Sequence, residues 1–104
     1  MADLSNKHYL KSVLRTLHKV YGEDVDLYFS SKKDKKFMVQ DPNGKWVHFG
    51  SRFYDDWHSH KDPIRREKYL KRATNIKGNW KDNMFSPNNL ALRVLWDWNG
   101  KNLK

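Results

Sequence analysis

Apolar residues recur along three stretches of this chain at intervals of three and four, the spacing that brings side chains onto one face of an α-helix. The pattern predicts helices over about residues 5–21, 62–77 and 87–98. Residues 24–50 instead alternate apolar and polar side chains, which is typical of β-strands. The predicted architecture is therefore α+β, with three helices packed on a small antiparallel sheet of two or three strands.

The clearest local signal is a β-hairpin at about residues 36–49. Its strands flank Asp41-Pro42-Asn43-Gly44, in which proline sets the second turn position and glycine takes the left-handed position that follows a type I turn. Alternation puts four apolar residues on one face of the sheet only if the register of the strands brings the two pairs together: Phe37 and Val39 with Val47 and Phe49. Met38, Trp46 and His48 point the other way, so either a second layer covers that side or Trp46 is displayed.

Both later helices open with a capping residue followed by proline, Asp62-Pro63 and Ser86-Pro87. Gly78 is expected to close the first of them. The core face of the last helix is predicted to consist of five residues: Leu90, Ala91, Val94, Leu95 and Trp98. Leu92 and Trp96 lie off that predicted face.

The helix over 62–77 combines a narrow apolar face with a row of cations. The apolar face holds Tyr69, Leu70, Ala73 and Ile76. Beside it Arg65, Lys68 and Arg72 lie at spacings i, i+3 and i+7, which spans roughly 10 Å along one edge. We call these three residues the basic stripe. A solvated helix usually mixes its charges, whereas residues 57–81 hold eight Lys or Arg against two acidic residues.

The composition points to a polyanionic partner. The chain has 104 residues, enough for one domain (1–104), and 21 Lys and Arg against 12 Asp and Glu give a net charge of +9. It has no cysteine, which excludes disulfides and thiolate metal sites. No apolar run resembles a membrane span or a secretory signal. We therefore expect an intracellular protein with no membrane partner.

Nucleic acid is the partner that this charge favours, with DNA ahead of RNA. The predicted phosphate contacts are nine cations: Lys61, Arg65, Lys68, Lys71, Arg72, Lys32, Lys33, Lys35 and Lys36. Phosphate contacts carry no base information, and no zinc-finger, leucine-zipper or RNP pattern is present, so binding should tolerate any sequence. Trp46 and Trp80 are candidates for base stacking; the alternative is that both fill the core.

One cluster has the chemistry of a metal site. His58, His60 and Asp62, near Asp55 and Asp56, would hold a divalent ion if the segment were extended, because alternate residues then point to one side. Such an ion would make the protein a small nuclease. The competing interpretation is structural, with Asp62 capping a helix and His60 packing on an aromatic ring. We expect no cofactor and no enzymatic activity.

Five segments carry a resemblance to known sequences: KKFMVQDPNGKWVHFG (35–50), HSHKDPIRREKYLKRAT (58–74), GNWKD (78–82), SPNNL (86–90) and LW (95–96). Together they resemble a family of small basic proteins of unknown function encoded by large nucleocytoplasmic DNA viruses and some phages. The resemblance implies a viral setting: genome handling or packaging in the viral factory or nucleus of an infected cell, or a place in the virion. The alternative function is that of a minor structural protein, capsid-associated or cement, acting through protein contacts.

Overall fold

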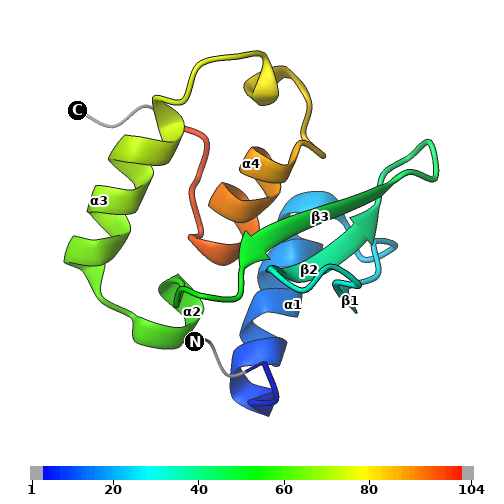
Figure 1. Cartoon of the computed structure of the whole chain (residues 1–104), viewed down its shortest axis with the longest axis horizontal. Helices are drawn as coiled ribbons and strands as arrows, with labels where there is room; N and C mark the ends of the chain where they lie inside the picture. Colours follow the sequence, from blue (N-terminus) through cyan, green and yellow to red (C-terminus); the bar gives the residue numbers. More distant parts are fainter. Residues whose placement is uncertain (1–3, 102–104) are drawn as a thin grey trace.

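The computed structural model describes residues 4–101. Its elements are α1 (Lys7–Tyr21), β1 (Tyr28–Phe29), β2 (Lys35–Gln40), β3 (Trp46–Ser51), α2 (Trp57–His60), α3 (Pro63–Thr74), η1 (Trp80–Asp82), α4 (Pro87–Leu90) and η2 (Ala91–Leu95). The strands form an antiparallel sheet in the order β1-β2-β3. Helix α3 lies at the opposite end of the molecule from the β2–β3 hairpin (Figure 1). The predicted α+β class is confirmed.

The predicted hairpin is present, and its register brings the four apolar residues together, because Phe37 pairs with Phe49 and Val39 with Val47. All four side chains are buried, together with residues of α1 and of the C-terminal segment. On the other face of the sheet, Trp46 is 42% exposed and its ring meets Tyr28 edge to face, with the ring centroids 5.4 Å apart. Of the two alternatives for that face, the displayed tryptophan is the one observed.

The alternation that begins at residue 24 yields only a short first strand. Val25 and Leu27 are half-buried against the core, but only Tyr28 and Phe29 join the sheet. The backbone of Val25 is already engaged by the end of α1: its N–H donates to Gly22, and its carbonyl contacts Nε2 of His18 at 3.0 Å. These groups are therefore unavailable for strand pairing.

Helix α3 ends at Thr74 and does not reach residue 77 as predicted. The Thr74 hydroxyl donates to the Leu70 carbonyl, and the Asn75 side-chain amide donates to the Lys71 carbonyl. The Asn75 side chain thus occupies the Lys71 carbonyl that the next helical turn would use, and the backbone N–H of Asn75 bonds to Arg72 instead. As a result Ile76, predicted to be in the core, is 52% exposed.

The C-terminal helix was predicted to run to about residue 98, but its α-helical part, α4, ends at Leu90. Residues Ala91–Leu95 form a π-helical segment in which the Trp96 N–H donates to the Ala91 carbonyl, five residues back. This wider turn shifts the side chains that follow off the expected face. Leu92 and Trp96, predicted to lie off the core face, are both buried. The expected cap, Ser86 accepting from Asn89 N–H, is present.

Candidate functional site

Helix α3 is held at its start by Asp62 and along its inner face by a few contacts. The Asp62 carboxylate accepts the N–H groups of Ile64 and Arg65, so the predicted cap is confirmed. Leu70 and Ala73 are buried. Arg66 donates from Nε to the carbonyl of Trp96 (2.8 Å) and from Nη2 to that of Asp97 (2.7 Å), which ties the helix to the end of η2. Arg66 therefore has a structural role.

The basic stripe lies on the solvent side of α3, where Arg65, Lys68 and Arg72 are all exposed. Between them Tyr69 turns inward and stacks on Trp96, with ring centroids 4.1 Å apart and planes 10° apart. The Arg72 guanidinium lies over the Tyr69 ring at 5.6 Å. Trp96, Tyr69 and Arg72 therefore form one stack, which holds the Arg72 end of the basic stripe against the protein.

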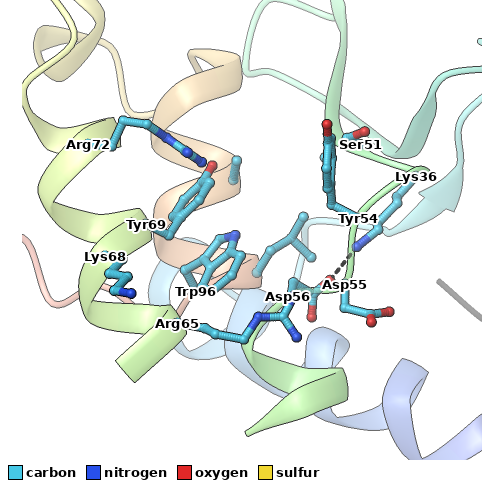
Figure 2. Close-up of a pocket in the computed structure, with 13 residues that line it drawn as sticks. Lys36, Ser51, Tyr54, Asp55, Asp56, Arg65, Lys68, Tyr69, Arg72 and Trp96 are labelled. Atoms are coloured by element: carbon cyan, nitrogen blue, oxygen red, sulfur yellow. Dashed lines mark hydrogen bonds and ion pairs between the residues drawn. The ribbon is translucent and has the colours of Figure 1, made fainter. Parts of the chain in front are cut away.

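A pocket of about 550 Å³ opens beside the stripe. Figure 2 shows its two walls, with Arg65, Lys68, Tyr69 and Arg72 of α3 on one side and Ser51 and Tyr54 on the other. The second wall is the end of β3 and the segment that follows it. The remaining lining residues are Lys36, Gly50, Asp55, Asp56, Ala91, Leu95 and Trp96.

A buried ion pair lies at this pocket, between Lys36 and Asp56. Lys36 Nζ donates to Asp56 Oδ2 at 2.8 Å, and the two side chains are only 2% and 1% exposed. The same oxygen accepts the hydroxyl of Tyr9 at 2.6 Å, and Oδ1 accepts the N–H of His58. Burial, followed by the nearby Asp56 charge, raises the pKa of Tyr9 well above its usual range. The tyrosine therefore remains a hydrogen-bond donor to Asp56.

Lys36, predicted to contact phosphates, is instead buried in β2, where its ammonium pairs with Asp56. Gly50, which packs beside Lys36, lets β3 approach η2 closely. A Cβ atom at Gly50 would lie 2.6 Å from a methyl carbon of Leu95, and the residue has φ of +80°. Only glycine fits there without displacing the buried Leu95 side chain or straining the backbone.

The charges of the pocket do not cancel. Four cations (Lys36, Arg65, Lys68 and Arg72) and two acids (Asp55 and Asp56) line it, which leaves a net charge of +2. Among residues 4–101 the ion pairs are Lys36–Asp56 and Lys71–Glu67. The three cations of the basic stripe therefore have no carboxylate partner in this part of the chain, and the pocket is suited to an anion.

The other predicted cations lie in varied surroundings. Lys32 and Lys33 are exposed on the turn between β1 and β2, and Lys35 is half-buried. Arg52 connects this turn to the pocket wall, since its Nε donates to the Lys35 carbonyl and its backbone N–H to that of Asp34.

Lys61 and Lys71, also predicted to contact phosphates, lie beside the stripe but do not line the pocket. Lys61 ends α2 in a left-handed conformation with its ammonium 5.4 Å from the ring centroid of Trp57. Lys71 pairs with Glu67 at 3.1 Å in an exposed i,i+4 bridge. Their charges are therefore close to the stripe but partly engaged.

Neither tryptophan proposed for base stacking lines the pocket. Trp80 donates its indole N–H to the Ile76 carbonyl, its ring packs against Trp98 with centroids 6.1 Å apart, and Lys81 lies over it. Packing is thus the observed role of Trp80. Trp46 is exposed, but its place in the hairpin puts it toward the end of the molecule opposite α3 (Figure 1).

The proposed metal ligands do not converge. The segment is the helix α2 rather than an extended strand, so His58 and His60 point in different directions. His58 uses both ring nitrogens, Nδ1 with the Ser12 hydroxyl and Nε2 with the Val94 carbonyl, each at 2.7 Å. Asp62 caps α3. Within residues 4–101 no group of three or more His, Cys, Asp or Glu residues is placed to hold a metal ion.

The buried His58 makes stability depend on pH. Desolvation, the largest effect, lowers the pKa of His58 below 6.5, so the unfolded chain binds this proton more readily. We expect the free energy of unfolding to be highest above about pH 6.5 and to fall below it, by at most about 1.4 kcal/mol per pH unit for one proton. Urea unfolding at about pH 7.5 and 5 measures the slope.

His58→Gln should reduce this slope, whereas His8→Gln, at an exposed position of α1, should leave it unchanged. The His58 variant will not abolish the slope, because desolvation also lowers the pKa of His60. Equal slopes in the two variants would contradict this assignment.

Sequence patterns missed three of the pocket residues. Tyr54 was given no role, Tyr69 was assigned to the core, and Trp96 was placed off the core face, yet all three line the pocket. One usable signal was present: an aromatic residue between Lys68 and Arg72 on the same helix brings a ring beside two cations.

Comparison with known proteins adds one partial match. Residues 25–73, just under half of the chain, match the model of a family of unknown function (DUF5754). The matched part contains Lys36, Asp56 and the basic stripe, but neither Tyr9 nor Trp96. No curated protein and no solved structure matches the chain. A search for membrane-spanning helices in residues 4–101 found none of sufficient length and apolarity.

Proposed function

We propose that this protein binds nucleic acid with little sequence preference, using the basic stripe as its main phosphate contact. The observation that carries the proposal is the set of three exposed cations on one edge of α3 that have no carboxylate partner within residues 4–101. Their side chains follow one another along roughly 10 Å. Phosphates along a backbone are the ligands that such a row matches.

The surrounding structure supports this assignment. Cations that serve the fold, such as Arg66 and Lys36, are engaged by carbonyls or a carboxylate, whereas the stripe is not. Lys61 and Lys71 add positive charge beside it, and Lys32 and Lys33 lie on the turn that Arg52 connects to the opposite wall. The protein needs no metal for this role, and we propose that it is not an enzyme.

The setting that the sequence resemblance implies, genome handling or packaging in a large DNA virus, is part of the proposal. Binding of duplex DNA without sequence preference is what such a role requires. An exclusive role in the shell of the particle would instead show as many ordered copies in purified virions and no affinity for DNA.

A salt titration of the complete protein tests the proposal. We expect micromolar binding of a labelled duplex at about 50 mM salt and, for three to five phosphate contacts, a loss of roughly 40- to 500-fold in affinity at 200 mM. Duplexes of unrelated sequence should bind equally well. Absence of binding at the lower salt concentration would refute the proposal.

A further inference from the structure

We infer that the pocket binds the terminal nucleotide of a strand, held by a phosphate monoester, and this inference rests on the proposed function. The basic stripe alone would bind any stretch of backbone. The pocket adds a concave surface and an exposed aromatic ring, Tyr54, next to the same cations. A pocket with these features fits the end of a nucleic-acid strand better than a stretch of its interior.

The shape of the site restricts its ligand. At about 550 Å³ the pocket falls within the roughly 300–1,000 Å³ typical of small-molecule sites. A duplex is a convex rod, so it can lie along α3 but cannot enter between α3 and the Ser51–Tyr54 wall (Figure 2). An unpaired nucleotide at a strand end can enter.

The charge of the pocket favours a phosphate monoester over a phosphodiester. A monoester carries about −1.5 to −2 at pH 7, which matches the net charge of +2, whereas an internal phosphodiester carries a single negative charge. The guanidinium groups of Arg65 and Arg72 can each hold two phosphate oxygens at once. A terminal phosphate also presents more free oxygens than a bridging one.

Lys36 and Asp56 do not contact the ligand. Their side chains are only 2% and 1% exposed, and the Lys36 ammonium already donates to the Asp56 carboxylate, so the pair adds no net charge to the pocket. The positive charge that faces the ligand comes from Arg65, Lys68 and Arg72, against the single acid Asp55. These three cations are therefore the groups that would hold the phosphate.

Tyr54 offers the surface on which the base would stack. Its side chain is 70% exposed and forms part of the wall facing α3 (Figure 2). Tyr69 cannot take this role, because Trp96 covers one face of its ring and Arg72 lies over it as well. Stacking on an aromatic ring accepts every base, which agrees with binding that ignores sequence.

The test compares short single strands of one sequence that differ only at their ends. Strands with a 5′ phosphate, a 3′ phosphate, two hydroxyl ends or no end at all (a closed circle) are titrated into the complete protein at about 150 mM salt. We expect a strand with one of the two terminal phosphates to bind about tenfold or more tightly than the hydroxyl-ended strand and the circle. The preferred end identifies the polarity.

Tyr54→Ala should lower the affinity for the preferred strand about tenfold. Phe53→Ala is the matched control, since Phe53 is the adjacent aromatic residue, is 60% exposed and does not line the pocket. It should leave the affinity unchanged. Competition by a nucleoside monophosphate, compared with inorganic phosphate, distinguishes a nucleotide site from a site for any anion.

Equal affinity for all four strands would overturn this inference while leaving salt-dependent binding, and hence the proposed function, intact. An end preference that Tyr54→Ala does not reduce would also overturn it, because the phosphate would then bind elsewhere. Competition by inorganic phosphate as strong as by the nucleotide would overturn the nucleotide assignment. Failure of every strand and duplex to bind would refute both proposals.

Discussion

Replacing the basic stripe by glutamine (Arg65→Gln, Lys68→Gln and Arg72→Gln together) is expected to reduce duplex affinity by roughly 10²-fold or more and to lower the slope of log affinity against log salt by about 2.7. Each lost phosphate contact removes the release of about 0.9 counterion on duplex DNA. Glutamine keeps the helix propensity of Arg and Lys, so α3 should remain formed. Fluorescence anisotropy at several salt concentrations measures both quantities.

A change of net charge alone must be excluded as the cause. The matched control removes three exposed cations of α1, with Lys11→Gln, Arg15→Gln and Lys19→Gln, and lowers the net charge equally. None of these residues lines the pocket. We expect a loss of a few-fold and little change in the salt slope. Equal losses in the two triple variants would mean that the overall charge, not the stripe, attracts the DNA.

Lys36→Met is expected to destabilise the protein by about 3–5 kcal/mol, because it leaves the buried carboxylate of Asp56 without its cation. This is a large part of the stability of a small domain. Guanidinium unfolding at neutral pH measures the loss.

Lys71→Met provides the contrasting case. It breaks the exposed Lys71–Glu67 bridge, whose side chains are 56% and 61% exposed, and should cost about 0.5 kcal/mol or less. If Lys36→Met were as mild as Lys71→Met, the buried pair would not have the structural importance that its surroundings imply. The comparison thus separates a structural cation from a superficial one within the same chain.

Features with a local cause could be predicted from the sequence. The hairpin follows from the Asp41–Gly44 turn and the alternation on either side of it, and the start of α3 follows from Asp62-Pro63. The stripe could be identified because its spacing depends only on the helical period. In each case the responsible residues lie within a few positions of one another.

Features that depend on distant partners could not be predicted. Lys36 stands in a run of lysines that suggests a solvated loop, and only the position of Asp56, 20 residues on, shows that it is buried. His58 has the composition of a metal ligand, but Ser12 and Val94 take its two nitrogens. The π-helical turn that buries Trp96 has no simple sequence signature. The place of Trp96 in the lining of the pocket could therefore not be predicted.

The short helix α2 joins parts of the chain that are far apart in sequence. Asp56, which caps it, binds Tyr9 from α1, 47 positions away, while His58 reaches Val94, 36 positions away. Residues 25–73 cut out alone would therefore leave an acid and an imidazole stripped of their natural neighbours. We expect a relative that shares that stretch either to contribute equivalents of Tyr9 and the Val94 carbonyl from its own flanks or to lack these buried polar groups. A fragment trimmed to that stretch is a poor choice for expression.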